Sequence, residues 1–140
     1  MSYTVMILDD DPITLFLHKV IIEKSEFSLT PVAFSNARQT IDYITTHFEP
    51  GRAFLIFLDI NMPGMNGWEF MEQLSKQRIA ARIAVVIVSS SIDLADYAKA
   101  KTYREVVAYL EKPITIGMIN ELRSAPAINC LIVREDGQVK

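Results

Sequence analysis

Short apolar runs alternate with amphipathic stretches along most of this chain, and this alternation limits the folds that it can adopt. The apolar runs are interpreted as strands at residues 5–8, 29–34, 54–58, 84–88 and 106–110. The runs 54–58 and 84–88 are apolar throughout, which is typical of central strands in a parallel sheet covered on both faces.

Five helices are predicted between and after these strands. Asp11 supplies an N-cap and Pro12 a first helical residue, and apolar residues follow at helical spacing: Ile13, Phe16, Leu17, Val20 and Ile21. Asn36 caps a second helix, residues 67–77 form a third, Ser91 or Asp93 starts a fourth, and Thr115 starts a fifth. Five β-α repeats in this order predict an α/β fold with a doubly wound parallel sheet and right-handed crossovers.

Composition excludes several classes of protein. At 140 residues, with 50% hydrophobic and 22% charged residues, the chain is long enough for one domain with a core and is not a disordered sequence. A net charge of −3 argues against a surface for nucleic acid. The single Cys130 excludes an intrachain disulfide framework. Because no apolar stretch approaches the ~18 residues of a membrane helix, we expect a cytoplasmic protein.

Four aspartates follow two of the predicted strands. Asp9, Asp10 and Asp11 end the run 5–8, and Asp59 ends the run 54–58. If these two strands pair, the carboxylates crowd at one edge of the sheet, which is costly unless a cation or a proton lies between them. Ligands of doubly wound sheets bind at this same edge, where the strand order reverses. The placement of the four aspartates at this edge therefore indicates a binding site.

The aspartates suit a hard cation and a reactive carboxylate. Mg²⁺ takes oxygen ligands, which Asp9, Asp10 and Asp59 could supply, whereas Asp11 is assigned to the helix cap. Successive side chains of an extended segment point apart, so we expect only one of Asp9 and Asp10 to bind the cation directly and the other to act through water. Asp59 is the predicted nucleophile, since a carboxylate can attack phosphorus to form an acyl phosphate.

Three further features fit a phosphate site. Lys112 follows the fifth strand, and its ammonium could pair with an aspartate and then with a phosphoryl group. Ser89 ends the fourth strand and could donate its hydroxyl to a phosphoryl oxygen. Residues 61–67 are rich in Pro, Gly and Asn and form a loop that can direct backbone groups to metal and phosphate. Each residue alone could be an ordinary turn, cap or surface residue, but all of them fall just after strands.

The arrangement resembles the receiver domain of two-component response regulators. The resemblance covers residues 3 to about 123 and rests on four motifs that occur in order, at residues 7–11, 58–67, 88–90 and 109–113. It implies the flavodoxin-like strand order 2-1-3-4-5 with five helices. It also implies a receiver domain at residues 1–124, followed by a tail or linker at 125–140 whose role the sequence leaves open.

The resemblance assigns roles to Asp9, Asp10 and Asp59. It implies that Asp59 takes a phosphoryl group from a histidine kinase or a histidine phosphotransfer protein. Asp9 and Asp10 then bind Mg²⁺ together with Asp59 and the main-chain carbonyl of Asn61. The resemblance also implies a signalling domain rather than an enzyme, because such a domain catalyses only its own phosphoryl transfer and dephosphorylation.

The resemblance also implies a switch. Lys112 and Ser89 contact the phosphoryl group, the Lys112–Pro113 peptide is cis, and Ser89 and Tyr109 are the switch residues. Phosphorylation would change the affinity of the face formed by the fourth helix, fifth strand and fifth helix for a downstream protein. The same face could also form a homodimer, and the sequence does not decide this. No direct contact of this domain with nucleic acid or membrane is expected. We expect either a stand-alone receiver or a piece of a longer regulator or hybrid kinase.

Two other functions remain as alternatives. A metal-dependent phosphohydrolase with an aspartyl-phosphate intermediate usually carries a second aspartate two residues after its nucleophile to act as acid and base, and this chain has Asn61 there. A pseudo-receiver would bind partners without being phosphorylated, although every reactive position is filled here. Turnover of small phosphate esters identifies the first alternative, and failure to label with acetyl phosphate and Mg²⁺ identifies the second.

Overall fold

The computed structural model describes residues 2–49, 51–77, 82–90, 93–126 and 128. Within these ranges, five strands alternate with five helices. The strands are β1 (Ser2–Leu8), β2 (Val32–Phe34), β3 (Arg52–Asp59), β4 (Arg82–Ser89) and β5 (Val106–Glu111). The helices are α1 (Pro12–Lys24), α2 (Ala37–His47), α3 (Gly67–Lys76), α4 (Leu94–Ala100) and α5 (Ile116–Arg123).

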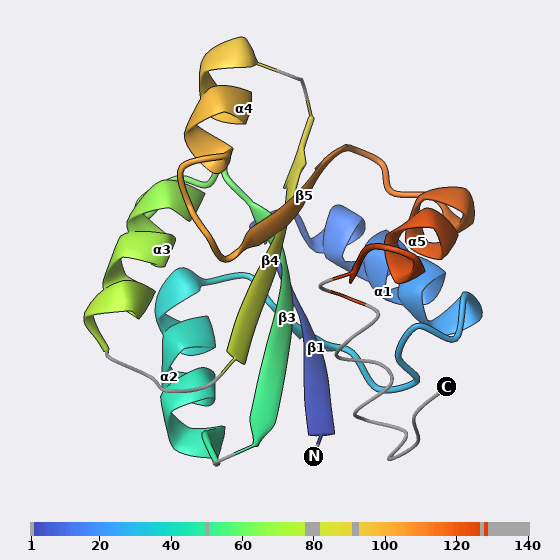
Figure 1. Ribbon diagram of the computed structural model, residues 1–140, viewed down its shortest axis with the longest axis horizontal. Helices are drawn as coiled ribbons and strands as arrows, with labels where there is room; N and C mark the ends of the chain where they lie inside the picture. The colour runs from blue at the N-terminus through green and yellow to red at the C-terminus, as the bar shows by residue number, and fades with distance from the viewer. Residues whose placement is uncertain (1, 50, 78–81, 91–92, 127, 129–140) are drawn as a thin grey trace.

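The strands form one parallel sheet in the order β2-β1-β3-β4-β5, which confirms the predicted fold. Helices α1 and α5 cover one face of the sheet, while α2, α3 and α4 lie on the other side (Figure 1). Because the chain goes from β1 outward to β2 and then returns to β3 on the opposite side of β1, the strand order reverses between β1 and β3. This reversal places the ends of two non-consecutive strands side by side.

Two apolar clusters fill the layers on either side of the sheet. Alternate residues of each central strand enter different clusters: Phe54 and Ile56 of β3 pack toward α2 and α3, whereas Leu55 and Phe57 pack toward α1 and α5. The side chains of β3 are therefore buried on both faces, which explains why the run 54–58 contains no polar residue.

The first apolar residues of α1 do not form its buried face. Ile13, Phe16 and Leu17 are 71%, 66% and 49% exposed, whereas the buried residues of this helix are His18 and Ile22. Apolar residues lie on several faces of α1, so helical spacing alone did not show which face packs on the sheet. The helical spacing of Ile13, Phe16 and Leu17 therefore predicts the helix but does not mark its buried face.

Most of the predicted helix caps are confirmed. The side chains of Asp11, Asn36 and Thr115 accept hydrogen bonds from the first turns of α1, α2 and α5. Asp93 caps α4, and the alternative cap, Ser91, lies outside the described residues. Strand β2 is shorter than predicted, and Leu29 lies before it with 71% of its surface exposed.

Strand β5 carries an irregularity that the sequence pattern did not indicate. Val85 of β4 pairs with Val106, but the next residue, Val86, pairs with Ala108. Val107 is thus an extra residue in β5, and both it and Ala108 pack on the α1 and α5 side. The extra residue shifts the alternation, and Tyr109 faces the opposite side, toward α4.

The end of the chain lies partly outside the described residues. Ile128 is fully buried in the cluster beneath α1 and α5, whereas residues 129–140, with Cys130, are not described. The proposed domain boundary near residue 124 therefore stays a prediction. Among the described residues, none of the helices is both long and apolar enough to cross a bilayer.

Candidate functional site at the carboxyl edge of the sheet

The strand register brings the aspartates together. Leu8 at the end of β1 pairs with Leu58 of β3, so Asp9 and Asp59 follow neighbouring positions at the carboxyl edge. One carboxylate oxygen from each of Asp9, Asp10 and Asp59 lies within 4.8 Å of the others. Asp9 and Asp59 are 2% and 3% exposed, whereas Asp10 is exposed to solvent.

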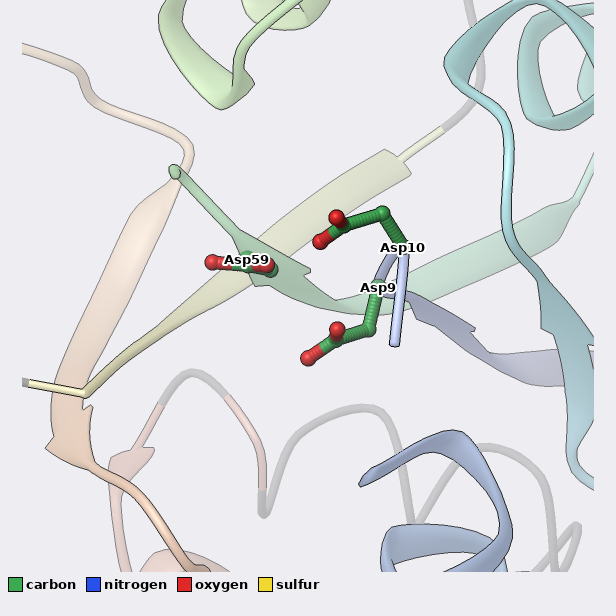
Figure 2. A group of neighbouring side chains, drawn as sticks. All are labelled: Asp9, Asp10 and Asp59. Carbon is green, nitrogen blue, oxygen red and sulfur yellow. The ribbon is translucent and has the colours of Figure 1, made fainter. Parts of the chain in front are cut away.

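Asp9 and Asp10 do not diverge as the sequence suggested. Figure 2 shows both side chains extending from the end of β1 toward the space beside Asp59. The chain bends immediately after β1, where the main-chain N–H of Asp11 donates to Asp9 Oδ1 at 2.9 Å. The expected alternation fails because these residues have already left the strand. A water-mediated role for one of the two carboxylates stays a prediction.

The turn after β3 fixes Asp59 from the other side. The main-chain N–H of Asn61 donates to Asp59 Oδ1 at 3.0 Å, and that of Gly67 donates to the carbonyl oxygen of Ile60 at 3.2 Å. A Cβ atom at Gly67 would lie 2.6 Å from the Cα of Ile60. Only glycine allows α3 to begin this close to the residue that follows Asp59.

Lys112 is the cation that faces this cluster. Its Nζ lies 2.7 Å from Asp9 Oδ2 and 3.4 Å from Asp59 Oδ2. The Lys112–Pro113 peptide is cis, as expected, and the main-chain N–H of Lys112 donates to the carbonyl oxygen of Ser89 at 2.7 Å. One ammonium against the three carboxylates of the group leaves a charge of −2.

Burial and charge shift the titration of both partners. Burial raises the pKa of Asp59, and the carboxylate of Asp9 raises it further against the hydrogen bond from Asn61 and the charge of Lys112. For Lys112, burial lowers the pKa, but the hydrogen bond to Asp9 and the charges of Asp9 and Asp59 outweigh it and raise the pKa overall. The lysine is therefore charged at neutral pH, while the charge on Asp59 is costly without a further cation.

The donor set fits Mg²⁺. All three side chains offer hard oxygen atoms, they converge from two strand ends, and their charge together with Lys112 balances a divalent cation. Two of these carboxylates are buried and one is exposed to solvent, which would suit an ion that retains several waters. The residues present at this edge are thus compatible with the metal that the sequence predicts.

Ser89 and Tyr109 connect the cluster to α4. Ser89 is 1% exposed, and its Oγ accepts a hydrogen bond from Asn61 Nδ2 at 3.3 Å. The hydroxyl oxygen of Tyr109 is buried, and its ring meets that of Tyr97 edge-on, with 5.6 Å between centroids. Burial raises the pKa of the Tyr109 hydroxyl, and the carboxylates of Asp96 and Asp93 raise it further. The predicted switch tyrosine therefore points inward beneath α4.

Two contacts around the site were not predicted. His18 of α1 is 2% exposed, and its Nε2 accepts a hydrogen bond from the main-chain N–H of Ile114 at 3.4 Å. Trp68 of α3 donates from its indole N–H to Asp96 of α4 at 3.3 Å. In the sequence, burial of His18 is indicated only by its position one helical turn before Ile22. That indication can be recognised only once the packing face of α1 is known.

Comparison with solved structures gives the same fold with related sequences. A two-component response regulator from Cytophaga hutchinsonii is 29% identical with a TM-score of 0.74, and the match covers 94% of this chain and 97% of that one. A response regulator receiver protein from Dyadobacter fermentans is 28% identical with a TM-score of 0.74, over 87% of this chain and 95% of that one.

Curated relatives are longer than the matching region. The nitrate/nitrite response regulator NarL of Escherichia coli is 33% identical over 87 residues, which is 62% of this chain and 38% of that protein. The transcriptional regulatory protein MalR of Bacillus subtilis is 33% identical over 111 residues, 78% of this chain and 43% of that protein. The match thus spans less than half the length of either relative. The profile of the response regulator receiver domain matches residues 5–123, and the chain therefore belongs to the response regulator receiver domain family.

Proposed function

We propose that Asp59 accepts a phosphoryl group from the histidine of a kinase or a histidine phosphotransfer protein, and that phosphorylation changes the affinity of the domain for a downstream protein. The observation that carries this proposal is the convergence of Asp9, Asp10 and Asp59 within 4.8 Å, with Lys112 against two of them. Membership of the receiver family supports the same reaction.

The geometry suggests how the transfer would proceed. An oxygen of Asp59 attacks phosphorus, the bond from phosphorus to the donor imidazole breaks, and the electron pair stays on that nitrogen. Lys112 already pairs with Asp59 and can shift to an oxygen of the transferred group, where it balances charge. Mg²⁺ held by Asp9, Asp10, Asp59 and the main-chain carbonyl of Asn61 would neutralise the phosphoryl oxygens.

The output would pass through Ser89, Tyr109 and α4. A phosphoryl group adds charge and acceptor oxygens. The Ser89 hydroxyl, which now accepts a hydrogen bond from Asn61, would donate to one of these oxygens. Because Tyr109 packs against Tyr97 of α4, a shift of Ser89 and Tyr109 alters the surface of α4. Trp68 donates to Asp96 of the same helix, so its fluorescence is a reporter of this change.

The test is labelling with acetyl phosphate and Mg²⁺, followed by intact-mass measurement and Trp68 fluorescence. The wild type is expected to gain one phosphoryl group that is lost slowly, while Asp59→Asn gains none. Asp42→Asn is the matched control, because Asp42 is an exposed aspartate on α2, and it should label normally. Labelling of a folded Asp59→Asn variant at the wild-type rate contradicts the assignment. Repeated turnover of small phosphate esters would favour the phosphohydrolase instead.

A further inference from the structure

His18 is a buried polar side chain without a role in the reaction described above. His18 lies on α1 and is 2% exposed, and its Nε2 accepts a hydrogen bond from the main-chain N–H of Ile114. The residue Ile114 is itself only 3% exposed. An imidazole accepts through Nε2 only when it is neutral with its proton on Nδ1. Burial lowers the pKa of His18, against the opposing charge of Asp9, and this favours the neutral ring.

The hydrogen bond from Ile114 fixes the segment that carries Lys112. Pro113 has no N–H, so Lys112 and Ile114 supply the main-chain donors of residues 112–114. Lys112 donates to the carbonyl of Ser89 on β4, and Ile114 donates to His18 on α1. The segment is thus held at one end by the sheet and at the other by the helix that follows Asp9 and Asp10. Between these two attachments, the Lys112 side chain reaches Asp9 and Asp59.

We propose that His18 is a positioning residue for phosphoryl transfer: its imidazole holds residues 112–114 against α1 and thereby keeps the Lys112 ammonium between Asp9 and Asp59. This inference rests on the proposed function of Asp59. Loss of the acceptor would leave the Ile114 N–H buried without a partner, and the segment would move to hydrate it. A displacement of about 1 Å at a catalytic group can reduce a rate by up to about 100-fold.

Three variants separate positioning from packing. His18→Leu fills the site with an apolar side chain and removes the acceptor, whereas His18→Gln provides an acceptor oxygen in place of the ring nitrogen. Ile22→Val is the matched control: Ile22 is fully buried one turn along the same helix and in the same apolar cluster as Ile114. This substitution reduces packing there but leaves the hydrogen bond between His18 and Ile114 in place. The initial rate of acetyl phosphate labelling is measured at saturating Mg²⁺ across donor concentrations, with circular dichroism to confirm folding.

We expect the maximum rate to fall about tenfold in His18→Leu, with little change in the donor concentration that gives half-maximal rate. His18→Gln should recover most of the rate, and Ile22→Val should label like the wild type. A folded His18→Leu at the wild-type rate overturns the proposal, as does an equal loss of rate in Ile22→Val. If the wild type itself does not label, it is the proposed function that fails.

A second measurement needs no variant. The Ile114 amide of the wild type is expected to exchange slowly with solvent deuterium in nuclear magnetic resonance spectra, because it is buried and bonded to His18. Rapid exchange of this amide in the folded protein would overturn the proposal even if His18→Leu does not fold.

If His18→Leu does not fold, His18→Phe replaces it in the rate measurement, because phenylalanine has a ring without an acceptor.

Discussion

At the scale of single residues, the proposed function depends on the cost of charging Asp59. The residue is 3% exposed and faces Asp9, and Lys112 lies closer to Asp9 than to Asp59. Its carboxylate is therefore short of compensating charge in the metal-free protein. Under the proposed function, this shortage of positive charge would favour binding of a cation and conversion of Asp59 to an acyl phosphate.

The first prediction concerns this cost. Asp59→Asn replaces the carboxylate with an uncharged amide of nearly the same shape. Without Mg²⁺ at pH 7, the variant should therefore have a free energy of unfolding higher by about 1 kcal/mol, or a Tm higher by roughly 4 °C. Burial raises the pKa of Asp59 above its ordinary 3.8. Between pH 3.8 and the raised value, the folded state binds more protons than the unfolded state, and the wild type loses stability as pH rises.

Below pH 3.8, Asp59 is protonated in both states of the wild type, so this advantage of the variant should vanish. Thermal unfolding in EDTA over a range of pH checks the prediction. A stability difference that does not change with pH, or a wild type that is the more stable at pH 7, would show that burial of the charge is not the dominant effect.

The second prediction tests the close approach at Gly67. Gly67→Ala places a Cβ 2.6 Å from the backbone of Ile60, so the end of β3 or the start of α3 must move. We expect a loss of about 1–3 kcal/mol in the free energy of unfolding and slower labelling of Asp59. Urea unfolding and acetyl phosphate labelling measure the two effects.

Gly117→Ala is the matched control for Gly67→Ala. Gly117 lies within α5, where an added Cβ has its nearest neighbour at 3.8 Å. This variant should gain up to about 1 kcal/mol from helix propensity and label normally. Equal effects of the two substitutions would contradict the importance of the contact between Gly67 and Ile60.

At the scale of elements, the two faces of α1 have different surroundings. Its inner face carries His18 and Ile22, which attach it to the lysine segment and the core. Its outer face exposes Ile13, Phe16 and Leu17 within the first two turns after Asp11. Under the proposed function, a phosphodonor would bring its histidine to Asp59 and would therefore also contact surfaces next to the site. We therefore expect the donor protein to cover this part of α1.

The third prediction follows from that expectation. Phe16→Asp should slow transfer from a histidine-phosphorylated donor domain that labels the wild type by about tenfold or more, because an apolar contact is lost and a charge is introduced. Labelling by acetyl phosphate, which needs no docking, should be unchanged. The ratio of the two rates is the measurement.

Leu29→Asp is the control for Phe16→Asp. Leu29 is 71% exposed, like the α1 residues, but it follows the far end of α1 and precedes β2, at the edge of the sheet opposite to Asp59. It should leave both rates unchanged. An equal slowing by Leu29→Asp would mean that charge alone, rather than contact at α1, affects the donor.

At the scale of the whole molecule, the candidate metal site lies where the strand order of the sheet reverses. Asp9 and Asp10 follow β1, and Asp59 ends β3, with the order of strands reversing between them. A cation that binds these groups only in the folded chain must stabilise the entire domain, because unfolding separates its ligands. If Mg²⁺ binds there, the stability of the protein is linked to its concentration.

The fourth prediction is a metal-dependent stability. Mg²⁺ at about 100 times its Kd should add about 2.7 kcal/mol to the free energy of unfolding, and EDTA should reverse the gain. Asp9→Asn should lose most of this response, whereas Asp42→Asn on α2 should retain it. Thermal unfolding is compared with NaCl at equal ionic strength. An equal gain from NaCl would show general screening rather than a site.

Much of the fold and the site follows from the order of residue types. Alternation of apolar runs with capped helices predicts the five repeats, and the aspartates, Ser89 and Lys112 fall where strands end. The carboxyl ends of parallel strands meet at one edge, so these residues could be expected together before their distances were known. His18 could not be identified, because its partner is a main-chain N–H 96 residues away.

Two other features depend on long-range packing. The spacing of apolar residues in α1 fits more than one face, and contact with α5 and the sheet selects the face with His18 and Ile22. In β5, pairing with β4 inserts Val107 as an extra residue and turns Tyr109 toward α4. Local sequence sets which residues alternate and where chains turn, since sterics and hydrogen bonding act between neighbours. Helix rotation and strand register depend on free energies of contact between distant segments, and these exist only once the segments pack together.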